Sequence, residues 1–540
     1  TTLSPPQTEI NSVIALYSNG QIQEALDAVE TLIKNYPNEP VLYNISGACF
    51  AGLGQLDNAL KSYKKTLAIK PDYAEAYNNL GVTFQELNQL DEAVKSFKKA
   101  LAIKPDYAEG HNNLGITLKN LGQLDEAIKS FKKALSIKPD YTDAHNNLGN
   151  VLKDHGQLDA AVKSYEKAIA IKPDHVEAFN NLGSTLKELG QLDTSVKSYE
   201  QVLAINPNYA EAHNNLGIAL KELDQHDAAL KCFEKALVIK PDFVEAHSNF
   251  GISLQELGQL DAAVKCFEKA LTIKPDHVEA HNNLGNALFD LGQHDAAVKS
   301  YEKSIAIKPD YAEGHNNLGI TLKELGQLDA SIKSYEKAIA IKPDHVEAHN
   351  NLGNALKDHG QLDAAVKSYE QVLAINPNFS EAHNNLGNTL RDLNQLDAAV
   401  KSYEKALAIK SDFAEAHNNL GNALNDLGQL DASIKSFEKA LAINPNYADA
   451  HYNLGNSLTN LDQLDAAVVS YDRALVLNPN INFILGQSLH AKMHLCLWDD
   501  LPNRLNELTK KINNNEKVIT PFSLLALIDD PEIQRKTAEI

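Results

Sequence analysis

Residues 142–175 decide the fold, and they read TDAHNNLGNVLKDHGQLDAAVKSYEKAIAIKPDH. The first half places apolar residues at helical spacing from Ala144 to Leu152, and the second half does the same from Leu158 to Ile171. Gly156 between the halves suits a left-handed helix stop, and Pro173 ends the second helix. Asp140 is predicted to cap the first helix, with acidic charge in the first turn. The stretch therefore predicts two antiparallel helices joined by a tight turn.

The same unit recurs every 34 residues along the chain. Its glycine, predicted to let the paired helices approach closely, returns from Gly47 to Gly455; its proline returns from Pro37 to Pro479, with Ser411 as the one exception. Units of 34 residues fill residues 6–481, and the first has Val13 in place of the glycine, as a terminal repeat with one neighbour can. A single hairpin cannot bury its apolar faces alone, so an all-α solenoid of about fourteen hairpins is predicted.

The unit resembles the tetratricopeptide repeat, TPR, whose characteristic residues correspond here to Leu148, Gly149, Ala161, Tyr165, Ala168 and Pro173. This resemblance covers residues 6–481. It implies a right-handed superhelical solenoid in which the first helix of each hairpin lines the concave surface. Residues 482–512 are expected to form a degenerate repeat and a capping helix, and residues 1–5 an N-terminal tail.

Polar residues of the first helix are expected to face that concave surface, namely Asp143, Asn146, Asn147, Asn150, Lys153 and Asp154. The position of Asn147 scarcely varies between units, although asparagine is not a favoured residue inside a helix. A carboxamide both donates and accepts hydrogen bonds, so a row of carboxamides could hold the main chain of an extended peptide. These candidate peptide-binding residues, the ladder asparagines, are Asn79, Asn113, Asn147, Asn181, Asn215, Asn249, Asn283, Asn317, Asn351, Asn385, Asn419 and Asn453.

The sequence allows other interpretations of the row of asparagines. Recent duplication would copy any asparagine, and the side chains could instead serve contacts between neighbouring helices. Acidic residues fill the position of Asp154 in most units, with lysines beside them in several, so a polar groove of mixed charge is expected.

Composition excludes several kinds of function. Lys+Arg number 50 against 71 Asp+Glu, a net charge of −21, which makes nucleic acid and anionic membrane poor partners.

The histidines of the first helix recur once per unit at a position that also holds Tyr43 and Phe179, so they indicate packing and not a metal site. No catalytic or cofactor motif is present, and four cysteines in 540 residues are not a disulfide framework. The N-terminus lacks the features of a signal peptide, and a cytoplasmic protein is expected.

The tail carries a second resemblance. Its motifs are Cys496-Leu497-Trp498-Asp499-Asp500 and the run from Pro521 to Pro531, PFSLLALIDDP. Together with the His-Asn-Asn-Leu-Gly repeats they resemble the N-terminal half of protein O-GlcNAc transferases, above all their bacterial, SPINDLY-like branch. Leu497 is a departure, because that family has Asp between the Cys and the Trp.

This second resemblance implies a substrate-recognition arm in which an asparagine ladder holds extended proteins for a catalytic domain. Residues 513–540 would then be a linker and the start of that domain, whose nucleotide-sugar lobes do not follow Ile540 here. Two alternatives are a free-standing scaffold that docks partner peptides and a solenoid that self-associates.

Overall fold

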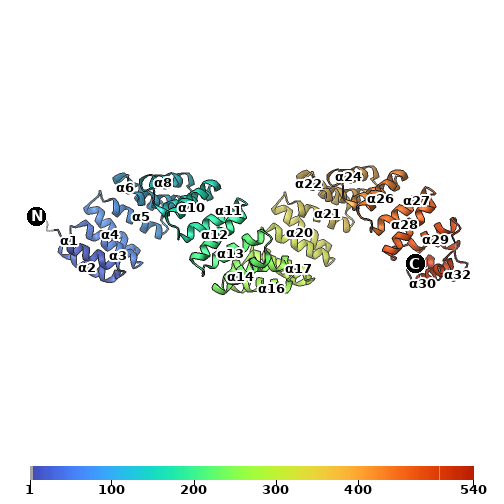
Figure 1. The fold of residues 1–540 in the computed structure, drawn as a ribbon, viewed down its shortest axis with the longest axis horizontal. Helices are drawn as coiled ribbons and strands as arrows, with labels where there is room; N and C mark the ends of the chain where they lie inside the picture. The colour runs from blue at the N-terminus through green and yellow to red at the C-terminus, as the bar shows by residue number, and fades with distance from the viewer. Residues whose placement is uncertain (1–3, 498) are drawn as a thin grey trace. The chain divides into compact units, whose positions relative to one another are not determined.

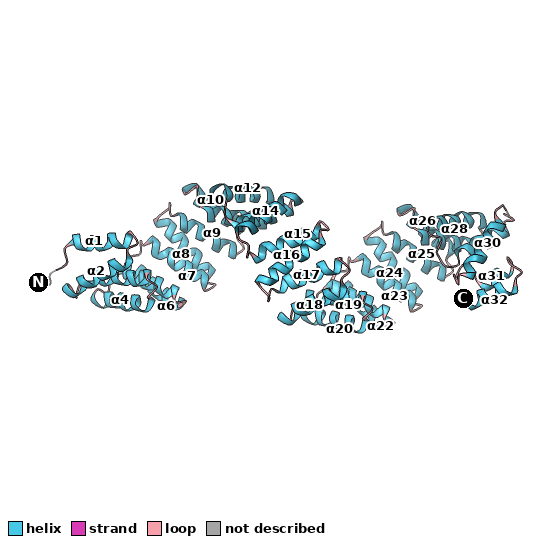
Figure 2. Ribbon diagram, turned by 90° about the horizontal axis from the view of Figure 1, so that it is seen from below, coloured by secondary structure: helices cyan, strands magenta, loops and turns pink. Residues whose placement is uncertain are grey.

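The structure is a computed structural model that describes residues 4–497 and 499–540, so the Trp498 of the tail motif and part of the expected N-terminal tail lie outside the described residues. Within these ranges every regular element is a helix (Figure 2). The chain forms two compact units, one ending at Ile273 and the other starting at Lys274. Both are stacks of antiparallel helix pairs, which confirms the predicted all-α solenoid (Figure 1).

The first unit contains eight helix pairs. Their bounds are α1 (Gln7–Ser18), α2 (Ile22–Asn35), α3 (Pro40–Gly52), α4 (Leu56–Ile69), α5 (Ala74–Glu86), α6 (Leu90–Ile103), α7 (Ala108–Asn120), α8 (Leu124–Ile137), α9 (Thr142–Asp154), α10 (Leu158–Ile171), α11 (Val176–Glu188), α12 (Leu192–Ile205), α13 (Ala210–Glu222), α14 (His226–Ile239), α15 (Val244–Glu256) and α16 (Leu260–Ile273).

The second unit continues the pairs and ends in four helices of different spacing. The bounds are α17 (Val278–Asp290), α18 (His294–Ile307), α19 (Ala312–Glu324), α20 (Leu328–Ile341), α21 (Val346–Asp358), α22 (Leu362–Ile375), α23 (Ser380–Asp392), α24 (Leu396–Ile409), α25 (Ala414–Asp426), α26 (Leu430–Ile443), α27 (Ala448–Asn460), α28 (Leu464–Leu477), α29 (Ile484–His494), α30 (Leu501–Asn513), α31 (Pro521–Leu525) and α32 (Pro531–Glu539).

In the pairs from α3–α4 to α27–α28, a glycine of the first helix faces an aromatic ring of the second helix. Tyr369 of α22 is fully buried, and a Cβ added to Gly353 of α21 would lie 2.6 Å from its Cε1. Gly149 faces Tyr165 in the same way, which confirms the predicted close approach. Small residues on the first helix therefore let a large ring of the second helix fill the space between them.

The ends of the helices agree only in part with those predicted from the sequence. Gly156 has φ +77°, so the left-handed stop after α9 is confirmed. The predicted cap at Asp140 is wrong: α9 begins at Thr142, and its N-cap residue, Tyr141, makes no side-chain cap hydrogen bond. The backbone N–H of Tyr141 donates to the carbonyl of Lys138 at 3.2 Å, and this turn places Asp140 one residue ahead of the cap position.

First helices and second helices occupy opposite sides of each stack. Successive first helices touch one another, as α7 does with α9 and α23 with α25, whereas the described second helices contact mainly the first helices on either side. Because the first helices lie close together and the second helices lie farther apart, each stack curves toward its first helices. The first-helix side is therefore the inner, concave surface of each unit. The second helices form the outer surface.

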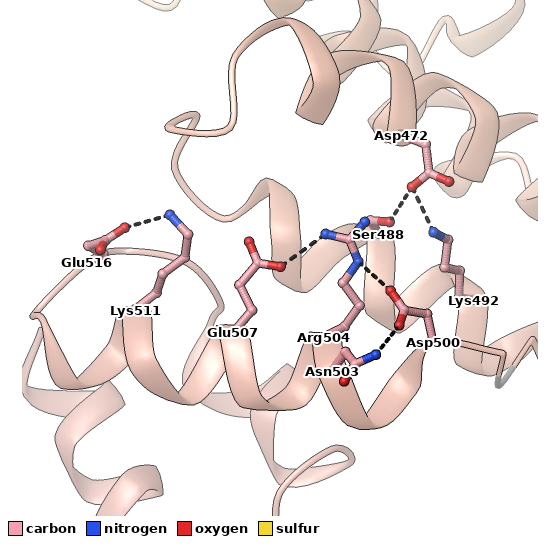
Figure 3. Close-up of polar contacts among 9 residues, drawn as sticks. All are labelled: Asp472, Ser488, Lys492, Asp500, Asn503, Arg504, Glu507, Lys511 and Glu516. Atoms are coloured by element: carbon pink, nitrogen blue, oxygen red, sulfur yellow. Dashed lines mark hydrogen bonds and ion pairs between the residues drawn. The ribbon is translucent and has the colours of Figure 1, made fainter.

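The C-terminal end of the second unit is covered by the four last helices. Asp472 of α28 accepts hydrogen bonds from Ser488 Oγ at 3.0 Å and Lys492 Nζ at 2.8 Å, both in α29 (Figure 3). Leu485 and Leu489 of α29 share an apolar cluster with residues of α30, α31 and α32. The last helices therefore pack on α29 and shield the apolar side that an end repeat would expose.

Candidate functional site

The ladder asparagines lie on the inner side of the two units, one on each first helix from α5 to α27. All twelve side chains are half-buried. In ten of the twelve repeats another asparagine comes just before the ladder residue, and most of these are buried. Asn146, expected on the solvent-facing stripe, is only 4% exposed, and that expectation is therefore wrong.

Among the described residues, a hydrogen bond between neighbouring repeats holds eleven of the twelve ladder amides, and the exception is Asn283. Asn147 donates from Nδ2 to Oδ1 of Asn112 at 3.1 Å, and Asn112 belongs to the preceding repeat. In the first unit the same bond is made by Asn79, Asn113, Asn147, Asn181, Asn215 and Asn249. In the second unit it is made by Asn317, Asn351, Asn385, Asn419 and Asn453.

The acceptors of these bonds form a second row, which we call the partner asparagines. They are Asn44, Asn78, Asn112, Asn146, Asn180 and Asn214 in the first unit and Asn282, Asn316, Asn350, Asn384 and Asn418 in the second. Most are buried, Asn78 and Asn384 to 2% exposure. Removing a donor from such a buried carbonyl costs about 1–3 kcal/mol, so the ladder asparagines have a structural role in addition to any binding role.

A third set of asparagines accepts hydrogen bonds from tyrosine hydroxyls of the second helices. Asn150 accepts a hydrogen bond from the Tyr165 hydroxyl at 2.8 Å and another from Nδ2 of Asn181 at 3.0 Å. Asn286, Asn354, Asn388 and Asn456 accept the same tyrosine bond at 2.7–2.8 Å. Where the second helix carries Phe97, Phe131, Phe233 or Phe267, the groove position holds valine or isoleucine instead.

Charged residues form a row of ion pairs beside the ladder. Lys153 Nζ lies 2.7 Å from a carboxylate oxygen of Glu188 in the next repeat, and Arg391 Nε lies 2.7 Å from Asp426. Equivalent pairs start from Lys119, Lys187, Lys221, Lys323 and Lys357. All are partly exposed and each stabilises the fold by about 1 kcal/mol or less. They neutralise charge along the groove and leave the amides as its main hydrogen-bonding groups.

The histidine row is a packing element. His145 is buried, and its Nε2 hydrogen-bonds the carbonyl of Pro139 at 2.9 Å, so this nitrogen carries the proton. Tyr43 makes the corresponding bond to Pro37 at 3.1 Å, so a tyrosine can take the place of the histidine there. Among the described residues no group of three or more His, Cys, Asp or Glu side chains could hold a metal ion.

The roles of the partner asparagines and the tyrosine bonds were not predicted from the sequence. A partial signal for the second was present, because several second-helix tyrosines follow an asparagine fifteen residues earlier, as in Tyr165 with Asn150, although Tyr335 follows Ile320. The partner asparagines gave no such signal, since a buried and an exposed asparagine look alike when both recur in every unit.

Comparison with known proteins agrees with this architecture. A family model described as "TPR repeat" matches residues 49–88, 84–122, 118–156, 149–190, 183–224, 253–292, 285–326, 321–360, 353–390, 387–425 and 421–462, and one described as "Tetratricopeptide repeat" matches residues 210–243 and 448–481. The chain belongs to the tetratricopeptide repeat family. TPR proteins generally mediate protein–protein interactions, and the resemblance stated above is confirmed to that extent.

Solved structures resemble parts or most of this TPR chain. The hetero-tetramer Cut9–Hcn1 of the APC/C is 15% identical with a TM-score of 0.42, over 85% of this chain and 97% of the matched one. YrrB, described as a TPR protein with an unusual peptide-binding site, is 25% identical with a TM-score of 0.31 over 35% and 96%. MamA is 26% identical with a TM-score of 0.29 over 31% and 97%.

Two further results concern this TPR chain. No curated protein matches it. In the described part of the chain, none of the helices has the length and apolar character needed to span a bilayer.

Proposed function

We propose that each unit binds an extended polypeptide segment on its inner surface and that the ladder asparagines hold the main chain of that segment. The observation that carries this proposal is the fixed orientation of the amides. Most bonded ladder residues use one N–H on the preceding repeat, Asn181 and Asn317 use two, and the side chains are still half-exposed. An amide has two N–H groups and an acceptor oxygen, so hydrogen-bonding capacity is left for a ligand.

Spacing supports a main-chain ligand. Packed helices lie about 8–10 Å apart, and an extended chain advances about 3.3 Å per residue. One ladder step therefore corresponds to about three residues of ligand. The row from Asn79 to Asn249 would accommodate a segment of about fifteen residues on this basis. Because the amides would contact backbone, binding should tolerate many side chains.

A pair of variants separates a binding role from a structural one. In the groove variant, Asn147, Asn181, Asn215 and Asn249 become alanine. In the matched control, their partner asparagines Asn112, Asn146, Asn180 and Asn214 become serine, the residue that the chain carries at the same position in Ser248. Both variants break the same four bonds between repeats, and the groove variant also removes the bond from Asn181 to Asn150. Only the first removes the groove amides.

Binding is measured by fluorescence anisotropy with a library of unstructured peptides, and folding by circular dichroism. The proposal expects the groove variant to lose about tenfold or more in affinity and the control to lose little, since about 1.4 kcal/mol of lost hydrogen bonding is a factor of ten. Equal affinities of the groove variant and the unmodified protein would contradict it. Equal losses in both variants would assign the ladder to structure alone.

We also propose that this capture of peptides serves a glycosyltransferase, as the recognition arm of an O-GlcNAc transferase-like protein. What supports it is the likeness of the repeats and of the tail motifs noted from the sequence. The test is the intact mass of the protein in its source, read with the reading frame beyond Ile540. A mass well above 59.1 kDa with a nucleotide-sugar domain would support the arm. A stop codon near Ile540 would contradict it and favour a scaffold, and concentration-dependent mass would favour self-association.

A further inference from the structure

The outer surface of the first unit carries a cluster of lysines. The second helices α4, α6 and α8 share the pattern Lys-Ser-aromatic-Lys-Lys. We call these nine residues the lysine array: Lys61, Lys64, Lys65, Lys95, Lys98, Lys99, Lys129, Lys132 and Lys133. All nine are exposed, and the stretches 61–71, 95–105 and 129–139 contain no acidic residue. In a chain of net charge −21, this is a local reversal of sign.

The remaining repeats show what usually neutralises such a surface. From α10 to α28 the middle lysine of the pattern is replaced by an acidic residue, as in Glu166, Glu370 and Asp472. Within the lysine array, the described ion pairs include one from Lys95, to Glu92 at 2.6 Å, and none from the middle lysines Lys64, Lys98 and Lys132. The carboxylate that the later repeats supply themselves is missing from the first three full repeats.

Open troughs that could receive such a carboxylate lie between some neighbouring second helices. Between α8 and α10 this trough has a volume of about 620 Å³, and Lys132, Lys163 and Lys167 line it above His145 and Leu148. The equivalent trough between α22 and α24 has Glu370 in place of Lys132 and Lys405 in place of Lys167. An anionic side chain seated between α8 and α10 would thus meet lysines from two helices.

We propose that the lysine array binds an acidic polypeptide segment of a partner protein, with carboxylates placed in the troughs between successive second helices. All nine cations are lysines, whereas arginine is the residue that grips phosphate through two parallel hydrogen bonds. The array is bordered by an acidic chain, which would repel a long nucleic acid or a charged bilayer beyond the array. A short acidic segment avoids that repulsion. This surface is separate from the inner groove.

Charge reversal at the middle position tests the proposal. The array variant combines Lys64→Glu, Lys98→Glu and Lys132→Glu, which gives these helices the residue that the later repeats carry. The matched control combines Lys303→Glu, Lys337→Glu and Lys405→Glu on second helices of the other unit, so the change in net charge is the same. Both changes fall on exposed side chains, and circular dichroism checks that both proteins fold.

The probe is a fluorescently labelled poly-glutamate peptide, followed by anisotropy. The unmodified protein and the control should bind it, the array variant should lose at least about tenfold in affinity, and raising NaCl from about 50 to about 300 mM should weaken binding markedly through screening. Equal losses in the array variant and the control would overturn the proposal, as would no binding by the unmodified protein. Tighter binding of a single-stranded oligonucleotide or of phosphatidylserine vesicles through the same lysines would also overturn it.

Discussion

At the scale of single residues, close packing and polar satisfaction depend on the same few positions in every repeat. A glycine accepts an aromatic ring, and a buried asparagine accepts a hydrogen bond from the neighbouring repeat. The glycine position lacks room for a methyl group, and loss of the ladder asparagine would leave the buried carbonyl of its partner without a donor.

Replacing Gly353 by alanine should destabilise the second unit by about 1–3 kcal/mol, because the new Cβ would overlap the ring of Tyr369. The measurement is the midpoint of urea unfolding. Gly110→Ala is the matched control, since alanine fills that position in most repeats, as in Ala144, and alanine favours a helix over glycine. A Gly353→Ala protein as stable as the control variant would show that the ring can move aside.

At the scale of helices and turns, a left-handed residue separates the two helices of a pair. Ten glycines with positive φ include Gly156 and Gly428, while Asn88 and Asn394 adopt the same conformation with φ of 57° and 58°. The space around these glycines is open, so the backbone conformation and not packing selects the residue. Glycine and asparagine are the residues that enter this region at least cost.

Gly156→Ala should lower stability by about 1–2 kcal/mol through backbone strain alone. Gly156→Asn should cost less, because the chain already places asparagine at the equivalent turn in Asn88. The comparison uses thermal unfolding followed by circular dichroism. Equal losses for the two variants would mean that the turn can relax into another conformation and that its left-handed residue is not required.

Most of the helix arrangement could be predicted from the sequence, because a spacing of 34 residues repeats each apolar position many times. The turn at Gly156 and the contact of Gly149 with the second helix were predicted correctly. The first-helix cap at Asp140 was not, since a backbone turn between Lys138 and Tyr141 decides where the helix starts. The ladder asparagines lie on the first helices as predicted, but the exposure of Asn146 was predicted wrongly, because helical periodicity does not show how closely the next repeat packs.

At the scale of the whole molecule, the stacking of repeats turns one buried histidine into a row. Burial lowers the pKa of His111, His213, His383 and His417, the hydrogen bond to a backbone carbonyl opposes this effect, and a nearby lysine adds to it. The lysines are Lys133, Lys235, Lys405 and Lys439. Stability therefore depends on pH in both units at once.

Stability should fall as the pH is lowered below about 6.5. The unfolded chain takes up protons on histidine near that pH, whereas the folded chain takes them up only at lower pH, so protonation favours unfolding. We expect the melting temperature to be constant above about pH 7 and to decrease as the pH falls through the folded pKa values. Differential scanning calorimetry across this range is the measurement.

A control for this pH dependence exists within the chain. Tyrosine replaces histidine at Tyr43 and makes the same bond to a proline carbonyl. The variant His111→Tyr, His213→Tyr, His383→Tyr and His417→Tyr should therefore keep the packing and flatten the pH profile. A profile unchanged by these substitutions would assign the effect to the carboxylates.

The bond between a ladder asparagine and its partner always joins residues 35 apart in sequence, as Asn147 and Asn112 are. Loss or gain of one whole 34-residue unit would again place a ladder asparagine beside a partner asparagine of the preceding repeat. The row of hydrogen bonds would therefore continue without interruption. An insertion of any other length would move one donor away from its acceptor and interrupt the row there. Unequal recombination between copies of the repeat can therefore add or remove whole repeats. The inner surface becomes longer or shorter, and its chemistry stays the same.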